Sequence, residues 1–579
     1  MLAGGMCVIP FLQPRHMPPI GTFYDEWLAF ALGLAAIGFA AGDRRNSATH
    51  VPVLAWCLVL FSLFLFVRAL GAWQGYFQSP LLWSLYVIFA AALVILGHAL
   101  ATRFGQERVC DFLASVLLAG ALANSLAGVL QIMGIPKEID SFVSNLRGIR
   151  ATGNLGQANL YANYIALGEA SLVYLFARAR LGRMAAFTGG ILLVGAASLA
   201  ASRGTILYSA AFAFLGFIAI SRQKDERARR VGYASLALGA SAIAMQWLVP
   251  AGMNLLGFHL ESGFRRNESF ESEGTIRDEA MHLRLVAWNV AYQLFMNSPW
   301  FGVGPDGFAG AAFAAGLPPE MSGNGVWTSP HNLLLHLLAE TGLVGTAFVV
   351  FGLVAWLLRA GSRFWRHPDA RHWWLLGCVG VECLHAMLEY PFWYAHFLAL
   401  TALIMGVGTR ADNGHGVELQ TNGLRVVFAS CAAVGTILIG VHLAAYFDFD
   451  LASPVAAGRS LASDGDIERD RDSLKRLSGT LLAPHAELWL FLALPFDAGN
   501  SAEKIALGER VLQFWPSRVV VVRQSIFLAL AGRREEAVAL LSKSLRTFRT
   551  QDQAIAEAIQ AAPQAARDML LPALSGHSQ

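Results

Sequence analysis

The chain has 579 residues, of which 55% are hydrophobic and 14% are charged, and its formal net charge is +3. A mean hydropathy of +0.48 excludes an ordinary soluble protein, and so small a net charge gives no reason to expect a nucleic-acid partner. We therefore predict an all-α, polytopic membrane helix bundle.

The predicted elements are mainly membrane spans, each of which needs roughly 20 mostly apolar residues to cross about 30 Å of hydrocarbon. Twelve are expected near 24–42, 51–70, 81–102, 109–133, 157–178, 184–201, 204–221, 231–251, 332–358, 373–390, 396–409 and 425–446. Residues 1–13 are apolar but short, and could be a signal peptide, an interfacial segment or part of a further span. Because no small-residue cleavage pattern follows them, we expect a thirteenth span.

Basic loops set the expected orientation. Every second connection is rich in Lys and Arg, namely "DRRNSATH", "TRFGQER", "RARLGR", "RQKDERARR" and "RAGSRFWRHPDARH". By the positive-inside rule these loops face the cytoplasm, and the other loops face outward. We expect a transmembrane domain at 1–446 with a large outward-facing loop at about 252–331, and a soluble domain at 447–579 outside the membrane.

One charge stands out between the spans at 184–201 and 204–221. Arg203 lies in "AASRGT", where Gly204 offers a backbone suited to a very tight turn. A planar guanidinium can bind phosphate at two points, which suggests an anionic headgroup. The alternative is an arginine that merely snorkels to the membrane interface.

The large loop contains a predicted amphipathic helix in "LRLVAWNVAYQLFMNSPWFGVGPDGF". Leu285, Trp288, Tyr292 and Phe295 recur at helical spacing, which favours a helix lying on an apolar surface. Arg284 begins this helix as a second outer cation, although a solvated helix face would account for it equally well. The Gly and Pro residues of "SPWFGVGPDGF" are expected to end the helix.

His331 begins the next span, with Ser329 and Pro330 expected as its cap and first-turn pair. The partial positive charge of a helix N-terminus disfavours imidazolium, so we expect a neutral histidine that can accept a proton. The alternative is a histidine bonded to loop carbonyls. Further along the same helix, His336 and Glu340 lie four residues apart and are expected to form a structural pair.

Three carboxylates fall within or at the ends of spans, where structural pairing is favoured over catalysis. Among Glu169, Glu382 and Glu389, the last lies four residues after His385, and an i,i+4 pair with His385 is the simplest interpretation.

The cysteines lie in apolar segments without metal-type spacing, so we predict neither disulfides nor a metal site. These are Cys7, Cys57, Cys110, Cys378, Cys383 and Cys431.

The tail from 447 onward is charged and alanine-rich. It contains "FLAL" at 491–494 and 527–530, and the second copy precedes "AGRREEAVALLSKSLRTF". This offset of 36 residues resembles a degenerate tetratricopeptide repeat, whose period is 34. We expect a small helical domain, which either helps to receive a protein or acts as a scaffold.

Five blocks together resemble the PglL-type protein O-oligosaccharyltransferases, within the O-antigen ligase and polymerase superfamily. The blocks are "RATGNLGQANLYANY", "SRGTIL", "RLVAWNVAYQLFMNSPWFGVGPDGF", "HNLLLHLLAETGLVGT" and "HAMLEYPFWYAHFL", and they cover most of residues 130–400. The early "FLQPRHMPPIGTFYDEWLA" also resembles the first outer loop of that family, which supports a preceding span.

The resemblance implies a glycan transfer from undecaprenyl pyrophosphate to an acceptor hydroxyl at the periplasmic face. The family's essential histidine carries over to His331, and its pyrophosphate-holding arginines to Arg203 and Arg284. Gln157 and Tyr394 are further substrate-binding candidates. This chain departs from the family at Ala158 and Leu160, where Pro and His are common, and in "SRGT" where "SRTG" is usual. The departures bear on substrate preference more than on the reaction.

We expect this transfer to proceed by single displacement with inversion, without a metal or cofactor. The expected partners are the lipid-linked glycan, membrane lipids, and a pilin-like protein or the lipid A core as acceptor.

A lipopolysaccharide O-antigen ligase or an O-antigen polymerase is the first alternative function, although both usually lack the tail domain. A non-enzymatic lipid-linked sugar transporter is the second, although it would spread charges through its spans.

Overall fold

The computed structural model describes residues 1–43, 49–71, 75–145, 149–222, 226–258, 276–316, 327–409, 418–453, 464–548 and 551–575. These ranges are almost entirely helical. Two-residue strands β1 (Thr49–His50) and β2 (Glu418–Leu419) form an antiparallel pair. The chain divides into two compact units, the first comprising Met1–Leu60, Tyr86–Arg277 and Phe348–Ile439, and the second Phe61–Leu85, Asp278–Ala347 and Gly440–Gln579.

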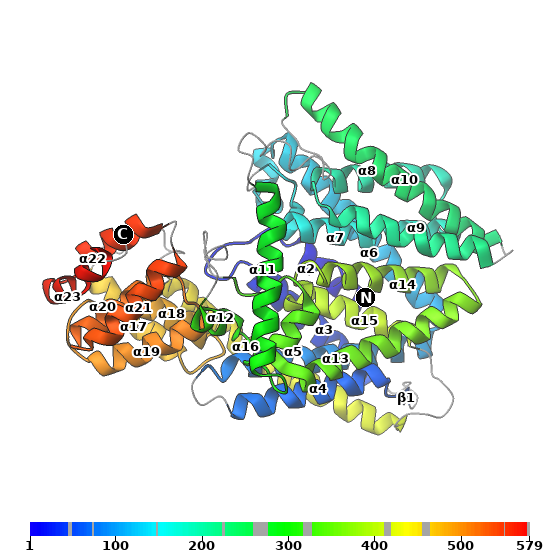
Figure 1. The fold of residues 1–579 in the computed structure, drawn as a ribbon. Helices are drawn as coiled ribbons and strands as arrows, with labels where there is room; N and C mark the ends of the chain where they lie inside the picture. Colours follow the sequence, from blue (N-terminus) through cyan, green and yellow to red (C-terminus); the bar gives the residue numbers. More distant parts are fainter. Residues whose placement is uncertain are drawn as a thin grey trace. The chain divides into compact units, whose positions relative to one another are not determined.

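Every one of the twelve predicted spans forms a helix (Figure 1). These are α3 (Phe23–Gly42), α4 (Val53–Leu70), α5 (Gln78–Phe104), α6 (Gln106–Met133), α7 (Ala158–Ala177), α8 (Arg183–Leu199), α9 (Gly204–Arg222), α10 (Glu226–Leu255), α13 (Leu333–Arg366), α14 (Ala370–Ala386), α15 (Ala395–Gly408) and α16 (Thr421–Ala452). Within the described ranges nine of them, all except α8, α14 and α15, are long and apolar enough to cross a membrane. The prediction of a polytopic helical membrane protein is confirmed.

The apolar N-terminal stretch forms two short helices, α1 (Leu2–Met6) and α2 (Ile9–Leu12). At 1.5 Å per residue the stretch reaches roughly half of the 30 Å of hydrocarbon, so it does not form a complete thirteenth span by itself. It packs inside the first unit instead. Phe11 is completely buried and stacks on Tyr164 of α7, with the ring centroids 4.2 Å apart.

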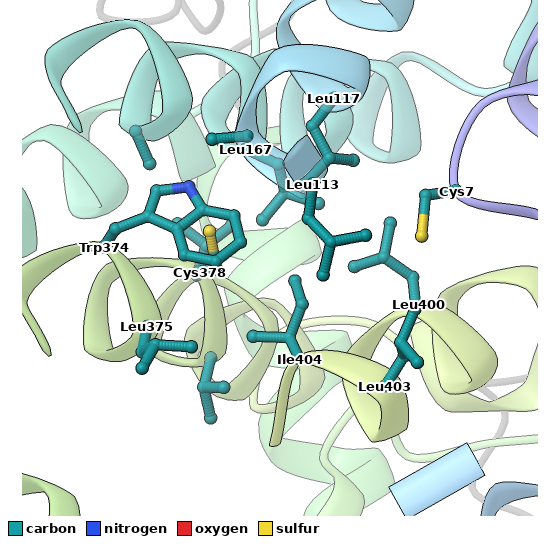
Figure 2. Close-up of a cluster of buried hydrophobic side chains, with 14 of the residues drawn as sticks. Cys7, Leu113, Leu117, Leu167, Trp374, Leu375, Cys378, Leu400, Leu403 and Ile404 are labelled. Atoms are coloured by element: carbon teal, nitrogen blue, oxygen red, sulfur yellow. The ribbon is translucent and has the colours of Figure 1, made fainter. Parts of the chain in front are cut away.

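The core of the first unit is built from helices α6, α7, α14 and α15. Figure 2 shows leucines of α6, α7 and α15 in one apolar cluster with Trp374 and Cys378 of α14. Helix α7 is the most enclosed of the candidate spans, because 94% of its apolar window is buried. The "GNLGQ" block lies directly before this helix, and its Gly153, Asn154 and Leu155 are buried as well.

Contacts among the loops of the first unit agree with the predicted alternation. Two of the connections predicted to be cytoplasmic meet each other, because Arg103 pairs with Asp43. Connections predicted to be periplasmic also meet, because Asn159 at the start of α7 bonds to Ser202 and to Glu389. The side of the membrane on which each set lies stays a prediction.

The second unit combines loop helices with the tail. Besides α11 (Ile276–Asn297) and α12 (Phe308–Ala315), it contains α17 (Asp464–Leu477), α18 (Ala483–Ala493), α19 (Ser501–Phe514), α20 (Arg518–Leu530), α21 (Arg534–Thr547), α22 (Asp552–Gln560) and α23 (Gln564–Ser575). One apolar cluster includes Phe308 and Phe313 of α12 together with Phe491 and Phe527 of the tail. The separate domain that we expected at 447–579 stays a prediction.

The tail is helical, as predicted, and its helices recur in pairs. The first pair, α18 and α19, and the second, α20 and α21, carry the two "FLAL" copies at the ends of α18 and α20. These helices lie together in Figure 1. Whether the pairs are a true tetratricopeptide repeat stays a prediction.

Helix α13 is interrupted, although its sequence predicts one continuous span. Gly342 has φ +62 and ψ −166, and the loop before α12 pairs with the helix at this break. Val303 N–H donates to Ala339 O at 2.9 Å, and Leu343 N–H donates to Pro299 O at 2.8 Å. The loop thus satisfies backbone groups that the interruption frees, as buried backbone N–H and C=O groups require.

Candidate active site

Arg203 is an exposed residue in the short turn between α8 and α9. The residue of this turn with positive φ is Ala201, at +43, and not Gly204, on which we expected the turn to rest. Gly204 is instead the first residue of α9, where a Cβ atom would lie 2.8 Å from the Tyr208 hydroxyl. Its small size is therefore needed for packing.

A network of hydrogen bonds joins this turn to α7, and Asn159 of α7 lies at its centre. The Asn159 side-chain oxygen accepts from Ser202 Oγ at 3.0 Å and from Arg150 Nη2 at 3.1 Å. The Asn159 amide donates to Glu389 Oε1 at 2.8 Å, and Arg150 Nε donates to Ala200 O at 2.7 Å. Three of these four bonds join parts of the chain that are distant in sequence, and together they fix the backbone on which Arg203 is carried.

Gln157 occupies the amino-terminal cap position of α7, in extended conformation, and is half-buried. The loop before it packs against His16, whose Nε2 lies 2.8 Å from Asn154 O. A Cβ atom at Gly156 would lie 3.2 Å from the His16 ring, so this loop follows the ring closely. The His16 segment and the loop before α7 therefore lie side by side.

Tyr394 occupies the cap position of α15 and is also half-buried. Its ring centroid lies 6.0 Å from that of Tyr390 and 5.8 Å from that of His396. The residue before Tyr390 is Glu389, which is bonded to Asn159. Asn159 in turn lies two residues after Gln157. The structure therefore places Arg203, Gln157 and Tyr394 at the same end of the first unit.

His331 lies in the second unit, two residues before α13 begins. Its φ is +52, a conformation uncommon for residues other than glycine, and its N–H donates to Ser329 Oγ at 3.1 Å. The cap that we assigned to Ser329 and Pro330 is wrong. Asn332 caps the helix, because its side-chain oxygen accepts from Leu335 N at 3.1 Å, and Ser329 stabilises the preceding turn instead.

Helix α11 contacts the His331 turn through a side chain on the face that carries Arg284. Trp288 Nε1 donates to Pro330 O at 3.0 Å, and Arg284 lies one helical turn before Trp288. This bond joins α11, which carries Arg284, to the turn that carries His331. Both Arg284 and His331 are half-buried. The helix ends at Asn297, as the glycine- and proline-rich segment predicts.

The stripe of α11 that packs on the protein differs from the expected one. Ala287, Val290, Ala291 and Leu294 are buried, whereas Leu285 and Tyr292 are each 53% exposed. Small side chains allow a helix to approach its neighbours closely, and this decides which face is buried. Periodicity alone could not distinguish the two stripes.

Arg203, Gln157 and Tyr394 belong to the first unit, and Arg284 and His331 belong to the second. Each group is brought together within its own unit. Their convergence on one diphosphate stays a prediction.

Of the three carboxylates for which structural pairing was expected, Glu382 and Glu389 have polar partners, and pairing of Glu169 stays a prediction. Glu382 Oε2 accepts from Asn163 at 3.4 Å, and the predicted His336–Glu340 pair is confirmed, with a Nε2–Oε2 distance of 2.9 Å. The predicted His385–Glu389 pair is wrong, because Nδ1 of His385 is 2.6 Å from Tyr208 Oη. Its Nε2 has no hydrogen-bond partner among the described residues.

Two polar residues of the site were missed by the sequence reasoning, namely Arg150 and Asn159. Both lie in the "RATGNLGQANLYANY" block close to Gln157, which was the only available signal. Among the described residues, no three His, Cys, Asp or Glu side chains are grouped as metal ligands would be, and all six cysteines are free thiols.

Comparison with known proteins gives two family matches. Residues 188–350 match the O-antigen ligase family, and residues 373–562 match the family described as virulence factor membrane-bound polymerase, C-terminal. Arg203, Arg284 and His331 fall within the first match, and Tyr394 falls within the second.

Two relatives from Acinetobacter baylyi are similar over most of the chain. A general O-oligosaccharyltransferase is 26% identical over 414 residues, covering 70% of this chain and 69% of the relative. A ComP-specific O-oligosaccharyltransferase is 24% identical over 440 residues, covering 75% of each.

The helical membrane fold and the two family matches define the class of protein that this chain resembles, the membrane-bound O-antigen ligases and polymerases. Its two relatives are both named O-oligosaccharyltransferases, so the similarity to that kind of enzyme extends over most of the chain.

Proposed function

We propose that this protein transfers a glycan en bloc from undecaprenyl pyrophosphate to Ser or Thr hydroxyls of a periplasmic protein such as a pilin. The observation that carries the proposal is the similarity to a general O-oligosaccharyltransferase over 70% of the chain. Three of the five candidate residues lie inside the O-antigen ligase match, which supports a reaction at the outer face of the inner membrane.

The candidate residues suit this chemistry. Arg203 and Arg284 hold the pyrophosphate and stabilise the charge that it gains as it leaves. His331 accepts the proton of the acceptor hydroxyl, whose oxygen attacks the anomeric carbon. The new glycosidic bond forms as the bond to pyrophosphate breaks, so the configuration inverts and undecaprenyl pyrophosphate is released. The two guanidinium groups supply the positive charge, and no metal takes part in the proposal.

A second candidate function uses the same residues on another acceptor. The two family descriptions name an O-antigen ligase and a membrane-bound polymerase, which would join the glycan to the lipid A core or to another glycan. A non-enzymatic transporter of lipid-linked sugar is a weaker alternative, because it does not account for a histidine placed beside an arginine-bearing helix.

Deleting the gene separates these functions. Intact masses of periplasmic proteins are compared with a lipopolysaccharide gel of the same strain. Loss of a glycan mass from protein, with unchanged lipopolysaccharide, is expected for the first function. Loss of the lipopolysaccharide ladder with unchanged protein masses would contradict it and support the second. Unchanged material in both assays would contradict both transferase functions.

A further inference from the structure

The second unit contains a cavity of about 530 Å³ that none of the candidate residues lines. This volume lies within the range of about 300–1,000 Å³ typical of small-molecule sites. Its lining includes Arg68 at the end of α4, Tyr76, Asp306, and Gln513 and Phe514 at the end of α19. Helix α12 forms one wall and lies beside the tail helices (Figure 1).

Polar side chains in the cavity retain hydrogen-bonding capacity. Arg68 makes one long bond within the described residues, from Nη2 to Gly302 O at 3.4 Å, although a guanidinium carries five N–H donors. The side-chain amide of Gln513 makes no hydrogen bond to any described residue. Asp306 is fixed in place, because its Oδ1 accepts from Trp83 Nε1 at 3.0 Å. Burial raises the pKa of Asp306 to about 6.

Two aromatic rings form an apolar surface in the same cavity. Tyr76 and Phe514 meet edge to face, with ring centroids 6.1 Å apart. The Tyr76 hydroxyl donates to Glu487 Oε2 at 2.9 Å, and Arg510 holds both oxygens of that carboxylate at 2.9 and 3.1 Å. The rings are therefore held in fixed positions, which lowers the entropy cost of binding against them.

The loop backbone beside the cavity offers little to an extended peptide. Three of its N–H groups are already bonded, from Val303 to Ala339 O, from Gly304 to Glu340 O and from Gly307 to Gly304 O, at 2.9 to 3.0 Å. A peptide that binds as an added strand needs such groups unpaired. The cavity instead combines aromatic faces with planar polar groups.

We propose that this cavity binds sugar residues of the glycan that the enzyme transfers. A sugar ring presents apolar C–H faces, which pack on the rings of Tyr76 and Phe514, and hydroxyls, which bond to Arg68, Gln513 and Asp306. This inference rests on the proposed function and adds a glycan subsite that none of the candidate transfer residues lines.

The test is a pair of tryptophan substitutions on α12. Ala314 lines the cavity, whereas its neighbour Ala315 does not, and both are exposed. Ala314→Trp fills the cavity without removing a polar group, and Ala315→Trp is the matched control. The probe is free oligosaccharide released by mild acid from the lipid-linked pool of the source bacterium. Binding to the purified full chain in detergent is measured by saturation-transfer NMR.

Wild type and Ala315→Trp are expected to bind this oligosaccharide, and Ala314→Trp is expected to lose at least tenfold in affinity. Gln513→Ala should weaken binding by a smaller factor. Absence of binding to wild type, or equal binding by the two tryptophan variants, would overturn the proposal. This readout needs no transfer reaction, so it can fail or succeed independently of the proposed function.

A kinetic measurement distinguishes the donor glycan from the acceptor. Ala314→Trp is expected to raise the KM for the lipid-linked oligosaccharide about tenfold while leaving the KM for the acceptor protein unchanged. A raised KM for the acceptor alone would assign the cavity to the protein substrate and contradict a glycan subsite.

Discussion

Single residues of the candidate site are held in place by specific bonds. His331 has φ +52, a strained conformation for a residue with a Cβ atom, and it persists because its neighbours constrain it. Ser329 accepts from the His331 N–H, and Trp288 binds the adjacent Pro330 carbonyl. A backbone held in this way from two directions directs the imidazole into one region, which a proton acceptor requires.

Replacement of His331 tests its role as a base. We expect His331→Ala to lower kcat by roughly 10²- to 10⁴-fold, the usual contribution of general-base catalysis. The KM for the lipid-linked donor should change little. Transfer is measured in membranes with purified acceptor, and Asn332→Ala, which removes the helix cap, serves as the control for stability. Full activity of His331→Ala would exclude the proposed base.

The Asn159 network is expected to act by positioning the Arg203 turn. Asn159→Asp replaces the amide that donates to Glu389 with a second carboxylate. It should lower kcat/KM for the lipid-linked glycan by roughly 10- to 100-fold, because a buried hydrogen bond is lost. Glu389→Gln alone can still accept from Asn159 and should have a small effect. The double variant restores a donor and an acceptor, so activity should recover. Failure to recover would show that the network does not position the turn.

Among the secondary-structure elements, α13 departs furthest from what its sequence predicts. Its apolar run continues through residue 342, yet the helix is broken there and its freed backbone groups bond to the loop at 299–304. A Cβ atom at Gly342 would lie 2.4 Å from the Trp300 carbonyl carbon, so the two backbones approach at a distance only glycine allows. The break and the loop therefore stabilise each other.

Two glycines of the same helix provide a matched test of this contact. Gly342→Ala is expected to lower stability by roughly 2 kcal/mol or more, because the new methyl group both clashes and disfavours the positive φ. A Cβ atom at Gly361 meets nothing within 4 Å, so Gly361→Ala should be neutral or stabilising by up to about 1 kcal/mol. Thermal unfolding in detergent measures both variants. Equal unfolding temperatures would show that the contact is unimportant.

In the whole molecule, the candidate residues are divided between two compact units. Arg203 is carried by the first and Arg284 by the second, and the proposed mechanism requires both to hold one diphosphate. Groups that act on the same ligand have coupled effects, whereas independent sites have additive ones.

A double-mutant cycle tests this coupling. Arg203→Ala and Arg284→Ala should each lower kcat/KM for the donor by roughly 10- to 100-fold, as expected for lost charge-assisted bonds. Their double variant should deviate from additivity by about 0.5–3 kcal/mol. Gln293 is exposed on α11, and Gln293→Ala paired with Arg203→Ala should be additive. Additive losses for the two arginines would contradict one shared diphosphate.

The helices were predictable from sequence because each span is fixed by a local quantity, the length of an apolar run. The candidate residues were found partly by charge placement and partly by resemblance. Asn159 escaped notice because an asparagine near a helix start is ordinary, and its importance arises only from partners 43 and 230 residues away in sequence. The cap of α13 was misplaced by three residues because Ser329 and Asn332 are both good capping residues.

The sequence by itself determined that this is a multi-pass helical membrane protein that resembles the O-antigen ligases, since hydropathy and motifs are properties of short segments. Only the tertiary structure decided which face of α11 is buried, where α13 breaks, and how Asn159 joins the turns beside Arg203 and Tyr390. Each of these depends on close approach between distant segments, which packing and backbone hydrogen bonding settle and which no local pattern encodes.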